Sequence, residues 1–184
     1  MGLREGMAVV TPRSNQGPTG PLVEVYSPVP CPHSITNLVQ DNTAGTLLMG
    51  NSIWSPQGED YDFHVSWTPL AGPVSGLIDV RLSSSGDRYY VTFAPANVYV
   101  TARKAGQTFL LGGASRTIST AQPALLTVSL IGYRIVVKDD AVSGSPTLID
   151  VTDPNQTTLS GTHVRYYTGV GTKAIYDFAR GQPR

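Results

Sequence analysis

Hydrophobic and polar residues alternate in short stretches along most of residues 62–178, and turn residues separate one stretch from the next. Residues 62–67 place Phe63, Val65 and Trp67 on one side of an extended chain, because successive side chains of a strand point to opposite faces. The same kind of pattern recurs in residues 76–81, 89–93, 97–102, 126–130, 133–138, 148–153, 163–167 and 175–178. No segment has the period of a long helix, so the pattern predicts an all-β protein.

Turn clusters divide these stretches at intervals of about 8–12 residues, which is typical of a sandwich or a barrel. Clear examples are residues 85–87, 105–106 and 153–155. One face of each strand must be covered, so we expect two antiparallel sheets packed face to face. The alternation predicts a core made of Phe63, Val65, Trp67, Tyr89, Val91, Phe93, Val98, Val100, Leu126, Val128, Ile135, Val137 and Ile175.

The first part of the chain has a different composition. Residues 1–30 contain five prolines and four glycines, which resist both helix and central strand. We therefore expect an extended Pro/Gly-rich N-terminal arm, with a first strand at residues 22–26, followed by a sandwich domain at residues 31–184. Residues 31–61 read as loop-rich, with short strands expected at residues 34–35 or 46–49.

Charge and hydropathy exclude several classes of partner. The 13 basic and 13 acidic residues give a net charge of zero with no basic run, which argues against a nucleic-acid partner. The first ten residues hold only a short apolar run before Thr11 and Pro12, too short for a secretory signal or a membrane span. We therefore expect neither export by the secretory route nor a membrane partner.

The sequence predicts no cofactor and no metal site. The single cysteine, Cys31, cannot form a disulfide within the chain, and the three histidines are scattered. Two pairs of acids, Asp139 with Asp140 and Asp150 with Asp153, are more typical of turns than of metal sites, so they are interpreted as turn formers.

No catalytic residue is predicted either. Glycoside hydrolysis needs two carboxylates that converge on one bond. Asp60 and Asp62 share one face of a strand, but Glu59 points the other way and no third acid follows. A run of acids that enters a strand is more typical of a solvated edge than of an active site. The chain also lacks a Gly-x-Ser-x-Gly nucleophile elbow, so we expect a protein that is not an enzyme.

Several features of the second half of the chain occur in one order: a Gly-rich strand at 76–81 followed by Tyr89-Tyr90, a strand-turn-strand at 126–138, and a last strand ending in Asp177-Phe178. In this order they resemble the laminin-G-like branch of the concanavalin A-like jelly rolls. The resemblance covers about residues 60–180. It implies a sandwich of twelve to fourteen strands, whose first and last strands are neighbours and whose one outer face is concave. Members of that family bind glycans, bind proteins by their rims or hydrolyse glycosidic bonds. They often hold calcium at their rim, for which Asp139 with Asp140, or Asp150 with Asp153, would offer the oxygen ligands here.

The alternation also predicts which polar side chains face outward. If Tyr89 and Val91 face the core, Arg88 and Tyr90 point outward, and the next strand exposes Tyr99 and Arg103. The same argument exposes two more residues, Arg134 and His64. We predict that these six residues form a ligand or partner surface.

Two interpretations of that surface remain open. Tyrosine rings with arginines suit the stacking and hydrogen bonding of sugars, and the same residue types are enriched where proteins contact one another.

Two functions from different classes follow. The favoured one is a virion component, of the minor tail, adhesion or capsid-decorating kind found in bacteriophages, made in the host cytoplasm and assembled with other virion proteins into an oligomer. It would be built on a lectin-like sandwich with a glycan as a second partner. The alternative is a carbohydrate-binding module or glycoside hydrolase of a cellular organism. Such a protein is expected to carry a signal peptide and, if it is an enzyme, clustered acids, and the sequence shows neither.

Overall fold

The computed structural model describes residues 34–43, 60–83, 85–154, 163–169 and 171–183, and every regular element in these ranges is a β-strand. The strands are β1 (Ser34–Asp41), β2 (Tyr61–Ala71), β3 (Gly76–Leu82), β4 (Arg88–Phe93), β5 (Asn97–Lys104), β6 (Gln107–Ser115), β7 (Ala124–Ile131), β8 (Arg134–Asp139), β9 (Thr147–Thr152), β10 (His163–Thr168) and β11 (Lys173–Pro183). These ranges contain no helix able to cross a membrane. The sequence-based prediction of an all-β protein is confirmed.

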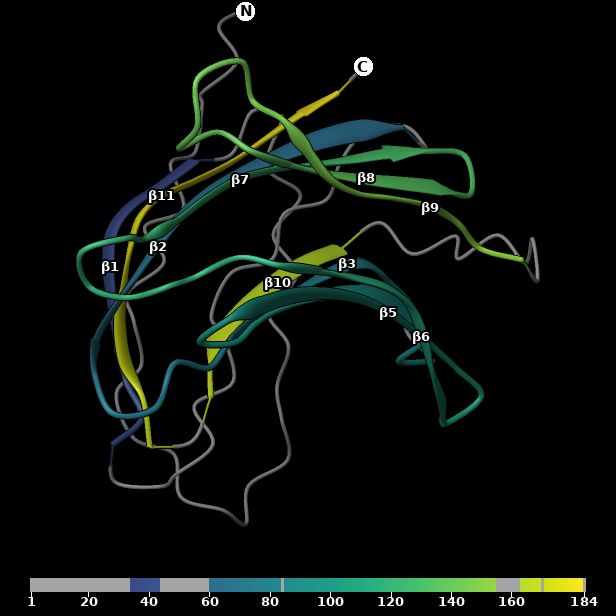
Figure 1. Cartoon of the computed structure of the whole chain (residues 1–184). Helices are drawn as coiled ribbons and strands as arrows, with labels where there is room; N and C mark the ends of the chain where they lie inside the picture. Colours follow the sequence, from purple (N-terminus) through teal and green to yellow (C-terminus); the bar gives the residue numbers. More distant parts are fainter. Residues whose placement is uncertain (1–33, 44–59, 84, 155–162, 170, 184) are drawn as a thin grey trace, which may run out of the picture.

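The strands form two antiparallel sheets that pack face to face (Figure 1). One sheet has six strands in the order β1-β11-β2-β7-β8-β9, and the other has five in the order β10-β3-β4-β5-β6. The first and last described strands, β1 and β11, are antiparallel neighbours, as the family resemblance implied. Both sheets curve in the same direction, so the outer face of the five-stranded sheet is concave (Figure 1).

The inward-facing side chains of both sheets form one apolar core. Trp67 of β2 meets Phe93 of β4 across the sandwich, with ring centroids 5.4 Å apart. Twelve of the thirteen predicted core residues belong to this cluster, namely Phe63, Val65, Trp67, Tyr89, Val91, Phe93, Val98, Val100, Leu126, Val128, Ile135 and Val137. Burial of these side chains is the main force that joins the two sheets.

The thirteenth predicted core residue, Ile175, was assigned to the wrong face. Tyr176 is fully buried in the core, whereas Ile175 is only partly buried. In the ladder with β2, Tyr176 lies opposite Trp67, and Ile175 lies opposite Thr68. Because Trp67 points inward, its partner Tyr176 must do so too. Residues 174–176 are all apolar, so the sequence alone did not fix the phase of the alternation.

Strand β6 was not predicted, because a pair of glycines interrupts its apolar pattern. A Cβ added at Gly112 would lie 2.7 Å from Val151 Cγ1 and 3.2 Å from Ile149 Cγ2. The missing side chain therefore lets β9 of the other sheet pack closely on β6. Strand β1 is also longer than the two residues predicted for it. The predicted arm at residues 1–30 and the possible strands at 22–26 and 46–49 lie outside the described residues.

Three ion pairs connect one sheet to the other. Lys104 of β5 reaches Asp153, which follows β9, at 2.5 Å. Arg116, which follows β6, reaches Asp139 of β8 at 2.6 Å. Arg81 of β3 approaches Asp60, which precedes β2, at 3.4 Å. The Asp153 and Asp139 side chains are 0% and 4% exposed, so these two pairs lie within the protein rather than on its surface.

Tyr89 completes the cluster around Asp153. Its hydroxyl donates a hydrogen bond to Asp153 Oδ2 at 2.8 Å, the same oxygen that Lys104 approaches. Burial, together with the adjacent carboxylate, raises the pKa of the Tyr89 hydroxyl, so the group stays protonated and acts as a donor. Strand β4 is thereby attached to the end of β9 by a polar contact within the interior.

We expect Asp153→Asn to lower the free energy of unfolding by about 3 kcal/mol, because it leaves the Lys104 ammonium largely buried without its counter-charge. Urea denaturation followed by circular dichroism measures the change. The matched control is Asp150→Asn, which removes an exposed carboxylate whose pair with Arg134 is 42% and 52% exposed, and should leave the urea midpoint nearly unchanged. Equal effects of the two substitutions would show that the Asp153 cluster does not join the sheets.

We expect Gly76→Ala to lower the free energy of unfolding by about 1–3 kcal/mol, because overpacking forces a shift in the core. A Cβ at Gly76 would lie 2.8 Å from Trp67 Cε2 and 2.9 Å from Phe93 Cδ2. Combining it with Trp67→Phe, which removes the crowded ring, should cost less than the sum of the two single changes. Strict additivity in thermal or urea unfolding would contradict this packing.

Candidate functional site

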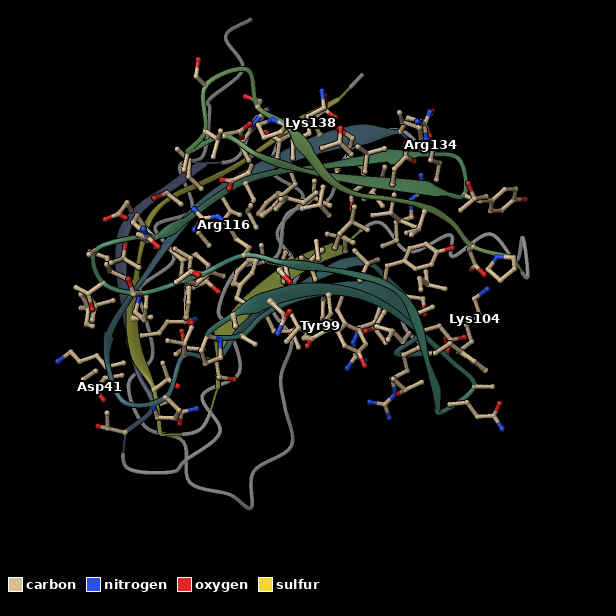
Figure 2. All side chains as sticks on the ribbon, in the orientation of Figure 1. Asp41, Tyr99, Lys104, Arg116, Arg134 and Lys138 are labelled. Carbon is tan, nitrogen blue, oxygen red and sulfur yellow. The ribbon has the colours of Figure 1, made fainter. Side chains whose placement is uncertain are left out.

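The concave outer face of the five-stranded sheet brings together four of the six predicted surface residues. In the ladder between β4 and β5, Arg88 lies opposite Arg103, Tyr90 opposite Thr101, and Thr92 opposite Tyr99. Both tyrosines are partly exposed and Arg103 is exposed. Figure 2 shows Tyr99 on the side of the sheet that faces away from the six-stranded sheet. We use the name concave surface for the outward-facing residues of this ladder together with Asp79 of β3, namely Asp79, Arg88, Tyr90, Thr92, Tyr99, Thr101 and Arg103.

Arg88 is held in one position by three contacts. Its Nε lies 2.9 Å from Asp79 Oδ1, and its Nη1 donates to the carbonyl oxygen of Gly86 at 2.8 Å. Its guanidinium carbon lies 5.6 Å from the centre of the Tyr90 ring, within the range of a cation–π contact. The Arg88 side chain is 13% exposed and the Asp79 side chain is 0% exposed. Asp79 and the Gly86 carbonyl oxygen therefore hold the Arg88 guanidinium beside the Tyr90 ring.

Tyr99 lies against a glycine on the neighbouring strand. Gly113 of β6 is its cross-strand partner, and a Cβ added there would lie 2.8 Å from Tyr99 Cδ1. The ring can therefore lie close to the β6 backbone, which no other residue at position 113 would permit without a shift. Tyr90 and Tyr99 occupy diagonal positions on adjacent strands, roughly 7–8 Å apart at Cα.

The remaining two predicted residues lie on the six-stranded sheet, so they are not part of the concave surface. Arg134 of β8 makes a bidentate pair with Asp150 of β9, with Nε–Oδ1 and Nη2–Oδ2 distances of 2.7 and 2.5 Å (Figure 2). The hydrogen bonds from Arg134 lower the pKa of the Asp150 carboxyl. Arg134 and His64 both point outward, but from the six-stranded sheet, which is the opposite layer of the sandwich.

His64 of β2 belongs to a hydrogen-bonded chain on that opposite layer. Thr127 Oγ1 donates to Asp140 Oδ2 at 2.5 Å, and the His64 Nδ1 lies 2.7 Å from the same Thr127 oxygen. A hydroxyl has one proton to donate, so the ring nitrogen must be the donor to Thr127. His64 is therefore oriented by Thr127 and Asp140.

The acids considered for calcium or catalysis do not gather into one site. Asp139 and Asp153 pair with Arg116 and Lys104, and Asp60 Oδ1 accepts a hydrogen bond from the backbone N–H of Gly132 at 2.6 Å. Within the described ranges no three His, Cys, Asp or Glu side chains are grouped as metal ligands.

Asp79 was not predicted as a site residue, although a signal for it exists. In β3 it alternates with Ile78 and Val80, which are both fully buried in the core. An acid between two core residues must face outward, and the ladder with β4 places it opposite Tyr90. What the sequence does not contain is the pairing of β3 with β4, which brings Asp79 to Arg88.

No protein-family model matches the sequence, and no curated protein matches it. Among solved structures, sheep galectin-11 in complex with glycerol aligns with 74% of this chain and 100% of its own, with a TM-score of 0.55 and 11% identity. The lumenal domain of VIP36 in its Ca2+/Man3GlcNAc-bound form aligns with 68% of both chains, with a TM-score of 0.55 and 13% identity. Exo-inulinase from Aspergillus awamori aligns with 83% of this chain but 29% of its own, with a TM-score of 0.56 and 11% identity. The fold is that of the concanavalin A-like sandwiches, as the sequence resemblance implied.

We expect Asp79→Asn to lower the free energy of unfolding by about 2–3 kcal/mol and to release the Arg88 side chain, because the guanidinium loses its buried counter-charge. Urea unfolding measures the stability, and the Arg88 Nε–H resonance in an NMR spectrum reports its exchange with solvent. Asp41→Asn is the control, since its pair with Lys173 is exposed on both sides. If the Arg88 resonance stays as protected in Asp79→Asn as in the unchanged protein, the carboxylate does not hold the arginine.

Proposed function

We propose that this protein is a non-enzymatic, glycan-binding β-sandwich and that the concave surface is its binding site. The observation that carries the proposal is the pair of partly exposed tyrosines, Tyr90 and Tyr99, on diagonal positions of one curved sheet face. The galectin and the Man3GlcNAc-bound VIP36 domain with which the chain shares its fold are consistent with this choice of ligand.

The chemistry of the surface suits a sugar. The apolar face of a pyranose ring stacks on an aromatic ring, and its hydroxyl groups need fixed donors and acceptors nearby. Tyr90 and Tyr99 supply the rings, while the partly exposed Thr92 supplies a hydroxyl on the same face. Because Arg88 is already held by Asp79 and Gly86, binding would cost little side-chain entropy at this position.

The absence of a second acid favours binding over hydrolysis. Among the described outward-facing residues of the five-stranded sheet, Asp79 is the only acid, and its carboxylate is occupied by Arg88. Hydrolysis by the usual routes needs two carboxyl groups across the scissile bond. The proposal is therefore a binding protein rather than a glycoside hydrolase.

We further propose that this sandwich is an adhesion or structural component of a virion of the bacteriophage type. The proline- and glycine-rich composition of residues 1–30 suits an arm that docks on a neighbouring subunit. In that setting the concave surface would serve either a host glycan or another virion protein. A carbohydrate-binding module of a cellular organism is the alternative, and the same binding surface would serve it.

Tyr90→Ala and Tyr99→Ala should each weaken glycan binding about tenfold or more, because truncating a central contact residue typically costs more than about 1 kcal/mol. A glycan array identifies the bound sugars, and calorimetry with the best of them measures the affinity. The control is Tyr133→Ala, which removes a partly buried tyrosine from the turn between β7 and β8 and should leave the affinity unchanged.

The outcomes separate the two interpretations of the surface. Loss of array binding in both tyrosine variants supports the lectin-like function. An empty array, combined with tyrosine-dependent copurification with a large particle, would overturn glycan binding in favour of protein docking. If neither assay responds to either substitution, the concave surface has no binding role.

A further inference from the structure

Arg103 differs from the other arginines whose side chains the structure describes. Four of them, Arg81, Arg88, Arg116 and Arg134, each lie within 3.4 Å of an aspartate oxygen. Arg103 is exposed on the concave surface and makes no ion pair with any described residue. An exposed guanidinium does not select a ligand by itself, so the residues around Arg103 decide what it can bind.

The residue directly opposite Arg103 in the sheet is a second arginine. Arg88 of β4 and Arg103 of β5 are cross-strand partners, and like charges at such positions destabilise a sheet. The Asp79 carboxylate lies 2.9 Å from the Nε of Arg88, and no ion pair joins a described acid to Arg103. The described side chains of the concave surface therefore include two guanidinium groups and one carboxylate, which gives them a net positive charge beside Tyr90.

The position of Arg103 relative to the tyrosines sets the chemistry it would select. Tyr90 lies opposite Thr101, two residues before Arg103 on the same face of β5. Tyr90 and Arg103 are therefore diagonal neighbours, roughly 7–8 Å apart at Cα, within reach of two long side chains. A sugar ring stacked on Tyr90 would direct a charged substituent towards the free guanidinium.

From this arrangement we propose that the ligand of the concave surface is an acidic glycan, with a sugar carboxylate bound by Arg103. The planar guanidinium matches a carboxylate with two parallel hydrogen bonds, whereas a lysine would offer only a point charge. Uronic acids carry such a carboxylate on the ring that stacks. The inference rests on the proposed function, because it names the class of glycan that the same surface takes.

The test compares ligands with and without a charged carboxyl group. Calorimetry with the full chain uses oligogalacturonate, oligomannuronate and glucuronoxylan oligosaccharides, each beside its neutral methyl ester. We expect at least one acid to bind about tenfold or more tightly than its ester, as a pair of charge-assisted hydrogen bonds provides. Dextran sulfate serves as the probe for general attraction to anions.

Three variants assign the preference to Arg103. Arg103→Gln should lower affinity for the acid about tenfold and leave the ester unchanged, and Arg103→Lys should give an intermediate loss. Arg134→Gln removes an exposed arginine from the opposite sheet and should change neither affinity. Arg103→Gln should not lower the melting temperature, because it removes the repulsion from Arg88.

The failure of this inference can be told apart from the failure of the proposed function. Tyrosine-dependent binding with equal affinity for acid and ester would keep the glycan-binding function and overturn the acidic ligand. An unchanged acid affinity in Arg103→Gln, or a loss of the same size in Arg134→Gln, would overturn the role of Arg103. If dextran sulfate competes as well as the best acid, the preference reflects general attraction to anions, and the specific carboxylate site is overturned. No binding of any acid or ester, together with an empty glycan array, would overturn both proposals.

Discussion

The relative position of the two sheets depends on charges enclosed between them. Apolar burial joins the sheets, but the hydrophobic effect itself is non-directional. The Lys104–Asp153 and Arg116–Asp139 pairs are directional, and their carboxylates are 0% and 4% exposed. Such buried pairs add little stability compared with apolar residues of the same size, yet breaking one of them leaves a costly unpaired charge. Each pair therefore penalises any arrangement of the sheets that separates its partners.

This constraint extends to the concave surface through strand β4. Tyr89 points inward and donates to Asp153, while its neighbours Arg88 and Tyr90 point outward. Arg88 is fixed in turn by Asp79 and by the carbonyl oxygen of Gly86. A binding surface held from both sides loses little conformational freedom when a ligand arrives, so more of the contact energy remains as affinity. The interior polar cluster and the proposed binding site thus lie on opposite faces of strand β4.

Related sandwiches differ in chemistry because the fold supplies two outer faces and leaves their residues free. In this chain the two faces are distinct. The convex face carries the paired Arg134 and the chain of hydrogen bonds from His64 through Thr127 to Asp140, in which every named group has a partner. The concave face carries two partly exposed tyrosines and Arg103, which makes no ion pair with any described residue. A ligand would therefore gain more on the concave face, where fewer partners have to be displaced.

The sequence by itself determined the all-β class, the sandwich and the inward or outward direction of most side chains, because a strand alternates its faces residue by residue. It did not determine the direction of Ile175, since Ala174 and Tyr176 on either side are also apolar and only the pairing with Trp67 selects the phase. It also missed β6, where Gly112 accommodates Val151 of the other sheet and Gly113 accommodates Tyr99 of the neighbouring strand. Only the tertiary structure separated His64 and Arg134 from Tyr90 and Tyr99, and only it joined Asp79 to Arg88. Alternation is a local property of each strand, whereas the sheet to which a strand belongs depends on pairing between segments far apart in the sequence.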